Sequence, residues 1–512
     1  MRPSSRTASQ PRPSPGSGPD PGARGAVLYC RRMSGPEFDG APPAPESSTS
    51  PLRPFFHPWV TWLSTALVAG LIGYLFMLTP GGPLDRLHRP EDSLERLTER
   101  DMDVRTALRH ATPWERRLFT LLSGGDEGID DWIRWHEELA LVSSSPDVEL
   151  SRLILLGETR QTEELRSALD AWEDDGEPAA RRKDWIEAAY LEPSLSRADG
   201  RALITEVRDE LPGGWFADAL VARLARRSGD AIARQQAEAS IAARGLILLR
   251  RWRSLEAAGL LLAVAGLATV GVMLLSHADL TVADARMPGG FSLTEGYALF
   301  IRGALGFLLL GAGLGLAIPD DSALDVITGP ATVAPILLYA AWYLRSRGVS
   351  FTAAFGLLPG RDRLGTVAWV ALALVGLQLT GESLVAAALD ALRLSSHWAD
   401  GLQENLIWGS WGLVASETIG SVLWAPLGEE VAFRGILYPA LRSRLGVAPS
   451  AALSAVVFAV AHGYGVLGFA AVFWSGVLWA VAYERTRSLW PSIVAHAAGN
   501  VAATVGVVAL LR

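Results

Sequence analysis

The chain has 512 residues, of which 49% are hydrophobic and 18 are tryptophan, and its formal net charge is −8. The length exceeds that of one ordinary domain, the hydrophobic content favours a membrane protein, and the acidic balance excludes a basic face for nucleic acid. The single cysteine, Cys30, excludes an internal disulfide and a cysteine-ligated metal site.

Residues 1–54 are dense in proline, serine and glycine. They contain too little apolar surface to offset the entropy of the chain, so we predict a disordered tail. The segment lacks a compact apolar stretch with a small-residue cleavage site, which argues against a signal peptide. Met33 is a second possible start, and the sequence does not decide between it and Met1.

Residues 58–79 contain no charged side chain. As a helix rising 1.5 Å per residue, the segment would be about 33 Å long, enough to cross the hydrocarbon core of a bilayer. Aromatic residues lie near both of its ends, as is typical of membrane interfaces. The sequence therefore predicts a first transmembrane helix here.

Residues 81–253 carry apolar residues at steps of three and four among many charges, which predicts a mostly helical soluble domain inserted after the first span. Its charged faces and lack of a motif favour binding over chemistry. If the bundle that follows is self-sufficient, the region is either an added module that contacts another protein or a solvated spacer, and the sequence favours neither. His88, His110 and His136 lack metal-ligand spacing, so we predict solvated or half-buried helix residues.

Hydropathy resumes after residue 254 and predicts eight or nine spans in total. The further windows are 257–275, 298–318, 326–344, 364–385, 406–425, 449–462, 465–483 and 491–511. We assign no role to the helices of 257–344 and predict one bundle over 360–512. Arginines in the short loops favour an outside position for the soluble domain, although LRRWR at 249–253 argues against it. Lys183 is the single lysine, which suggests a GC-rich bacterial genome and hence the bacterial inner (cytoplasmic) membrane.

The stretch GEEVAFRG at 428–435 places charge inside this apolar half, where an ionised group costs several kcal/mol. Pro426 predicts a helix start, which would put both carboxylates in a first turn where the helix dipole favours anions. Glu430 and Arg434 are four residues apart and can pair on one face, whereas Glu429 has no such partner and is free for chemistry. A plain charge cluster at the membrane boundary is the alternative.

Two histidines follow in apolar helices. His462 has Phe458 one turn before it, and His496 has Asn500 one turn after it. Each histidine alone would be read as a hydrogen-bonded core residue. Because every polar group in hydrocarbon must be satisfied, three polar insertions in successive helices predict one buried polar pocket.

The order EExxxR, FxxxH and HxxxN resembles the motifs of the CAAX-protease and bacteriocin-processing (Abi, CPBP) family of intramembrane glutamate-type proteases. The resemblance covers roughly residues 360–512 and does not extend to 1–253. One departure is Gly463-Tyr464-Gly465, where a short polar turn is expected after the second-motif histidine. The resemblance implies that Glu429, aided by His462, activates a water.

The resemblance further implies that His496 and Asn500 stabilise the oxyanion, and that Glu430, Arg434 and Phe458 have structural, orienting roles. No cofactor is required by this mechanism. Zinc is a rival interpretation, because a glutamate and two histidines resemble a zinc ligand set, but the sequence has no HExxH motif.

The expected partners are the lipid bilayer and a peptide or protein substrate, membrane-associated ones included. Two other functions stay open: a catalytically inactive scaffold that binds a partner through the soluble domain, and a membrane transporter. A transporter predicts inverted repeats, and the motifs have no second copy in the sequence. The natural substrate and the oligomeric state are left open by the sequence.

Overall fold

The computed structural model describes residues 57–512 except 79–81, 110, 123–127, 173–175, 193, 284–290, 319–325, 393 and 395. Within this part of the chain every regular element is a helix, which confirms the all-α fold class. The predicted disordered tail at 1–54, with Cys30 and Met33, lies outside the described residues, and so does His110.

Within the described residues, five helices are long and apolar enough to cross a membrane, so this is an integral membrane protein. They are α10 (Ala231–Ser276), α11 (Leu293–Ala317), α14 (Leu364–Ala391), α20 (Val466–Thr486) and α21 (Trp490–Leu511). The helix α1 (Pro58–Leu78) forms where the sequence predicts the first span. Two further predicted spans correspond to the shorter helices α12 (Thr328–Ser346) and α19 (Val447–His462).

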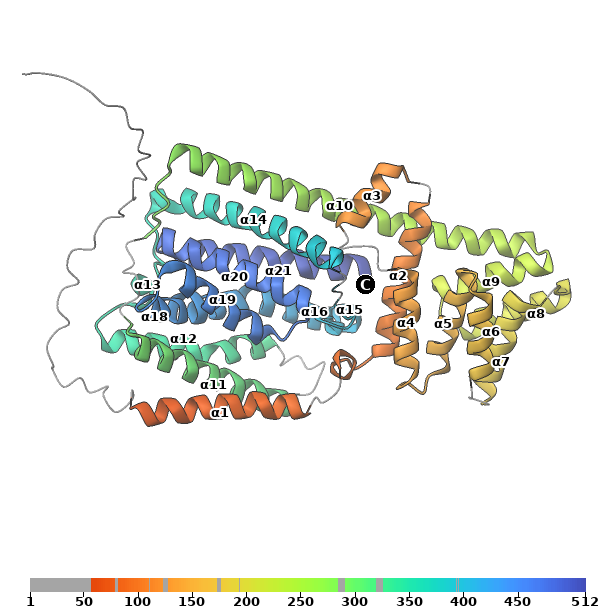
Figure 1. Ribbon diagram of the computed structural model, residues 1–512, viewed down its shortest axis with the longest axis horizontal. Coiled ribbons are helices and arrows are strands. Elements are labelled where there is room, and N and C mark those ends of the chain that lie inside the picture. The colour runs from red at the N-terminus through yellow and green to blue at the C-terminus, as the bar shows by residue number, and fades with distance from the viewer. Residues whose placement is uncertain are drawn as a thin grey trace, which may run out of the picture. The chain divides into compact units, whose positions relative to one another are not determined.

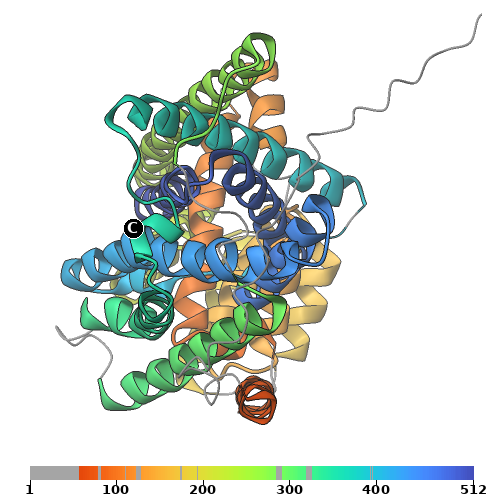
Figure 2. The ribbon, with the colours of Figure 1, turned by 90° about the vertical axis from the view of Figure 1, so that its left-hand side faces the viewer.

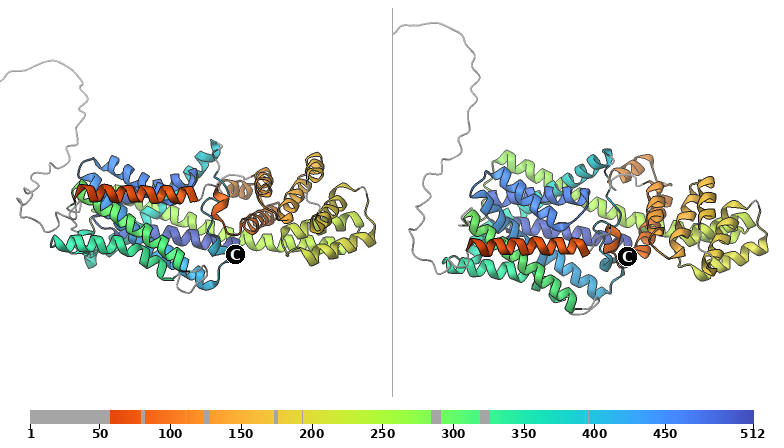
Figure 3. Two further views of the ribbon diagram at one scale, coloured as in Figure 1. Left: turned by 90° about the horizontal axis from the view of Figure 1, so that it is seen from below. Right: turned by 60° about the horizontal axis from the view of Figure 1, so that its bottom comes forward.

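We call residues 82–253 the helical region, and α1 together with residues 254–512 the bundle. In the bundle, α1 packs along α11, as Figures 2 and 3 show from two sides. The helix α11 in turn packs on α12, whereas α14, α20 and α21 pack on one another. The helix α1 therefore lies at the edge of the bundle, and α14, α20 and α21 form its centre.

The helix α10 belongs to both parts, because its 46 residues run without a break from the helical region into the bundle (Figure 1). It packs on α2 and α9 of the helical region and on α14 of the bundle. A Cβ atom at Gly266 would lie 2.6 Å from the Cα atom of Gly376, so two glycines let α10 and α14 approach closely. The predicted boundary near residue 253 falls inside this helix.

The helical region consists of short helices around one apolar core. Its helices are η2 (Pro83–Arg86), α2 (Pro90–Leu108), α3 (Pro113–Leu122), α4 (Ile129–Ala140), α5 (Pro146–Glu158), α6 (Thr162–Ala171), α7 (Glu177–Ile186), η3 (Glu187–Leu191), α8 (Arg197–Glu210) and α9 (Trp215–Ser228). Trp185 and Leu153 are fully buried in that core. Ser145 and Ser196 cap α5 and α8 by accepting backbone N–H groups, which explains where these two helices begin.

His136 is buried in this core, with 1% of its surface exposed, so the prediction of a solvated or half-buried histidine is wrong there. It lies one turn after Trp132 on the inward face of α4, and its Nδ1 atom lies 2.9 Å from the Trp132 carbonyl oxygen. Burial lowers the pKa of His136 to about 4. His88 is exposed, as predicted, but it lies in the bend between η2 and α2 and not in a helix.

The helical region is held to the bundle by residues that follow α14. Trp398 and Ala399 pack into the core of the helical region. Glu404, which begins α15 (Glu404–Trp408), accepts hydrogen bonds from the backbone N–H groups of His88 at 2.6 Å and Arg89 at 3.0 Å. It also accepts one from the Ser93 hydroxyl at 2.8 Å. This carboxylate therefore caps the N-terminus of α2 from outside the helical region.

The first motif lies in a helical stretch that runs without interruption from Trp411 to Arg442. Its parts are α16 (Trp411–Ile419), the π-helical η6 (Gly420–Trp424), α17 (Ala425–Glu429), the π-helical η7 (Glu430–Leu437) and α18 (Tyr438–Arg442). The residue before Pro426, Ala425, already has helical φ and ψ angles, so the prediction that Pro426 starts a helix is wrong. The wider π turn before the proline accommodates its ring inside the helix.

Candidate active site

Three of the predicted polar groups meet inside the bundle. Glu429 ends α17, His462 ends α19, and His496 lies in α21. The Oε2 atom of Glu429 lies 3.8 Å from the Nε2 atom of His462 and 3.8 Å from the Nε2 atom of His496. Two histidines that follow Glu429 by 33 and 67 residues in the chain therefore face one of its carboxylate oxygens.

The Nδ1 atom of each of the two histidines contacts another oxygen atom of the protein. The Nδ1 atom of His462 lies 2.8 Å from the Phe458 carbonyl oxygen, which can only accept, so this nitrogen carries the proton. The Nδ1 atom of His496 lies 3.3 Å from Oε1 of the Glu430 carboxylate, which favours a proton on that nitrogen too. In the neutral rings, both Nε2 atoms then present a lone pair toward Glu429.

The three side chains of this site differ in how far they are exposed. The Glu429 side chain is 30% exposed and that of His462 is 21% exposed, whereas that of His496 is 6% exposed. Within the described residues the Glu429 Oε2 atom makes no hydrogen bond. The site thus has a partly exposed side formed by Glu429 and His462 and a buried side formed by His496, and the Glu429 oxygen that faces the histidines is itself buried.

Glu430 and Arg434 form the ion pair that their spacing predicts. The Nη1 atom of Arg434 donates to Oε1 of Glu430 at 2.9 Å, and both side chains are fully buried. The Arg434 guanidinium lies 4.1 Å from the ring centre of Phe458 and 4.9 Å from that of Trp479, so the aromatic faces also stabilise its charge. Trp479 stacks on the ring of His496 as well, at 4.4 Å.

Trp479 was not among the residues that the sequence singled out. It lies in the apolar helix α20, where one more aromatic residue carries no signal of a site. Its role becomes visible only in three dimensions, because it contacts both the Arg434 guanidinium and the His496 imidazole. It holds the ring of the buried histidine in one orientation.

Asn500 contacts the backbone of η6. Its Nδ2 atom donates to the Ser421 carbonyl oxygen at 2.6 Å. In the π turn each carbonyl accepts from the N–H group five residues later, as the Gly420 carbonyl does from Ala425. The Ser421 carbonyl would therefore accept from residue 426, but this residue is a proline and has no N–H group. Asn500 supplies the hydrogen bond that the proline cannot, and its second amide hydrogen remains.

The segment after His462 differs from a polar turn. Gly463 ends α19 with a φ of 64°, a left-handed conformation that favours glycine, and the Tyr464 ring lies 5.5 Å from the His462 ring. The Arg86 side chain of η2 donates to the Gly463 carbonyl at 3.2 Å. The helical region therefore contacts the backbone directly beside a predicted catalytic histidine.

A half-buried carboxylate, that of Glu382, lies in α14. Glu382 accepts a hydrogen bond from the Gln378 side-chain amide at 3.0 Å, and a Cβ atom at Gly499 would lie 2.8 Å from that amide nitrogen. Gly499 is one turn from His496, so this polar pair lies next to the site. Sequence reasoning missed Glu382, although an acid within an apolar span is itself a signal of function.

No group of three cysteine, histidine or acidic side chains within the described residues could hold a metal ion. Residues 411–502, which include Glu429, His462, His496 and Asn500, match the family model described as Rce1-like, type II CAAX prenyl endopeptidase Rce1-like. Comparison with curated proteins gives no match, and comparison with solved structures gives none. Residues 411–502 therefore form a domain of the Rce1-like family of type II CAAX prenyl endopeptidases, in agreement with the family that the three motifs indicate.

Proposed function

We propose that this protein is an intramembrane endopeptidase in which Glu429 and His462 activate a water for attack on a peptide bond. One observation carries the proposal: a single oxygen of Glu429 faces the Nε2 atoms of two histidines at 3.8 Å each. A water between the carboxylate and either imidazole can lie at hydrogen-bond distance, about 2.8 Å, from both. The family match supports a CAAX-type protease at the level of the family.

In the proposed reaction Glu429 takes a proton from the water while the water oxygen bonds to the substrate carbonyl carbon. The oxyanion accepts hydrogen bonds from the second Asn500 amide hydrogen and from His496, which can donate from Nε2 only when both of its ring nitrogens carry protons. Glu429 then returns its proton to the leaving nitrogen as the C–N bond breaks. The products are a carboxylic acid and an amine, so the atoms balance.

We propose that the reaction needs no metal ion, with zinc as the rival. Zinc would have to be held by Glu429, His462 and His496, which are not arranged as a metal site among the described residues, and it would polarise the carbonyl and the water itself. We expect the cleavage rate of the purified protein to be unchanged by strong chelators. Activity that is lost in chelator and restored by zinc, or zinc bound in equal amount to the protein, would reverse the ranking.

The substrate is expected to be a membrane peptide or protein, and we propose the bacterial inner membrane as its location. The direct test compares new N-termini, labelled and identified by mass spectrometry, in membranes that contain wild-type or Glu429→Gln protein. Termini that appear with the wild-type protein and with a control variant, but not with Glu429→Gln, identify substrates. The control is Glu417→Gln, which lies in the same helical stretch and keeps an oxygen that accepts from the Asn405 side-chain amide. Identical termini in all three membranes would favour the inactive scaffold.

A further inference from the structure

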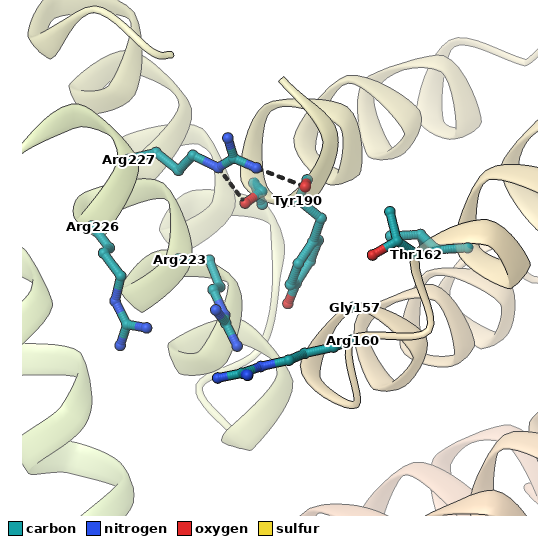
Figure 4. Close-up of a pocket in the computed structure, with 9 residues that line it drawn as sticks. Gly157, Arg160, Thr162, Tyr190, Arg223, Arg226 and Arg227 are labelled. Atoms are coloured by element: carbon teal, nitrogen blue, oxygen red, sulfur yellow. Dashed lines mark hydrogen bonds between the residues drawn. The ribbon is translucent and has the colours of Figure 1, made fainter. Parts of the chain in front are cut away.

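A second candidate site lies in the helical region, far along the chain from the three motifs. A cavity of about 300 Å³ opens between α5 and α6 on one side and η3 and α9 on the other (Figure 4). Four arginines line it: Arg160, Arg223, Arg226 and Arg227. None of the described residues that line it is acidic.

Two of the arginines are fixed by the protein. Arg227 donates from Nε to the Ala189 carbonyl at 3.0 Å and from Nη2 to the Tyr190 carbonyl at 2.6 Å, as the dashed lines in Figure 4 mark. Arg223 donates to both oxygens of Glu158, at 2.6 and 2.9 Å. These two guanidinium groups give the cavity rigid cationic walls.

The guanidinium groups of the other two arginines, Arg160 and Arg226, are available to a ligand. Arg226 contacts Glu238 at 3.3 Å, and both side chains are about half exposed, which makes this a weak surface pair. Arg160 is exposed, and Figure 4 shows its guanidinium extending beside that of Arg223. Glu158 already offsets the charge of Arg223, so Arg160 adds a cation to this wall of the cavity that an anionic ligand can pair with.

The backbone of Arg160 has a left-handed conformation. Arg160 directly follows the C-cap of α5 with a φ of 63°, a position that most often falls to glycine. The Gln161 N–H group donates to the Leu156 carbonyl at 3.0 Å and closes the helix end. The same conformation ends α10 at His277 and α20 at Arg487, so at Arg160 it closes the helix and fixes where the arginine side chain starts.

We propose that this cavity binds a carboxylate of an acidic polypeptide, with Arg160 and Arg226 as the principal contacts. The planar guanidinium fork matches a carboxylate, and the Tyr190 ring and Leu165 offer apolar surface to the carbon atoms that carry it. The volume is at the lower end for organic ligands and larger than an inorganic anion needs. This inference does not depend on the proposed protease activity.

The test measures fluorescence anisotropy of a labelled heptapeptide with three acidic residues and a free C-terminus, mixed with the full-length protein in detergent. We expect saturable binding that weakens at least tenfold in Arg160→Gly. Glycine suits the left-handed backbone, so this variant should fold at least as well as wild type. Arg208→Ala, an exposed change on α8 outside the cavity, should bind as wild type does.

Two further peptides locate the recognised group. Weaker binding of a C-terminally amidated peptide assigns the contact to the terminal carboxylate, and weaker binding of a peptide with amides in place of its acids assigns it to side chains. The proposal is overturned if Arg160→Gly binds as wild type does, or if the fully neutral peptide binds equally. Direct, saturable binding of inorganic phosphate that displaces the peptide would show a small-oxyanion site instead.

Discussion

Glu429 and Glu430 are neighbours in the chain but have opposite environments. Successive residues of a helix point about 100° apart, so one carboxylate faces the two histidines while the other faces Arg434. Glu430 is neutralised by a cation that two aromatic rings also contact. Glu429 has no such partner and is partly exposed, which is the environment that a proton carrier needs.

The two carboxylates should therefore respond differently to substitution. We expect Glu429→Ala to abolish cleavage and leave the protein folded. Glu430→Ala or Arg434→Ala leaves one buried charge unpaired, and we expect a loss of about 3–5 kcal/mol in the free energy of unfolding. Cleavage assays and unfolding of the purified variants measure both effects. Similar activity in Glu429→Ala and wild type would contradict the assignment of the base.

His136 predicts a pH dependence of stability in the helical region. Its pKa is about 4 in the folded protein, because of burial, against an ordinary value of 6.5. The unfolded chain therefore binds a proton first as the pH falls, and stability is lost between pH 6.5 and 4, by roughly 3 kcal/mol in total. His136→Leu should remove this part of the pH dependence, measured by tryptophan fluorescence. If the stability of wild type and of His136→Leu fell equally between pH 6.5 and 4, His136 would not be the cause of this pH dependence.

At the scale of elements, η6 explains why Asn500 is needed for structure as well as for the proposed chemistry. Asn500→Ala leaves the Ser421 carbonyl without its donor, which should cost about 1–3 kcal/mol of stability. Pro426→Ala restores a backbone N–H group, so in that background the cost should shrink. A double-mutant cycle on unfolding free energies measures the coupling. Additive effects would mean that the proline is not the reason for this contact.

The sequence predicted those features that depend on neighbours in the chain. The Glu430–Arg434 pair follows from a spacing of four residues, and the long helices follow from apolar runs. The π turns do not, because one extra residue rotates the following side chains by about 100°, and a segment that is apolar on nearly every face shows no break in its pattern when it is rotated. Trp479 and Glu404 were missed because their partners are distant in the chain, so that no local periodicity reports the contact.

For the whole molecule, the contact through Glu404 bears on whether the bundle is self-sufficient. A chain that starts near residue 253 would lose the N–H groups that Glu404 accepts and the core that buries Trp398. We therefore expect this shortened chain to unfold at a lower temperature in detergent than the full chain. Glu404→Gln in the full chain should reproduce part of that decrease. An unchanged unfolding temperature in both would show that the two parts are energetically independent.

The continuous helix α10 also sets how far the helical region extends beyond the apolar part of the bundle. Its residues 231–256 precede the apolar window and, at 1.5 Å each, extend about 39 Å beyond it. The start of α10 packs on α9, which lines the arginine cavity. An extended peptide covers about 3.3 Å per residue. A protein that is held at that cavity would need roughly a dozen extended residues to reach the apolar part of α10, so α10 would set a minimum length for substrates held in this way.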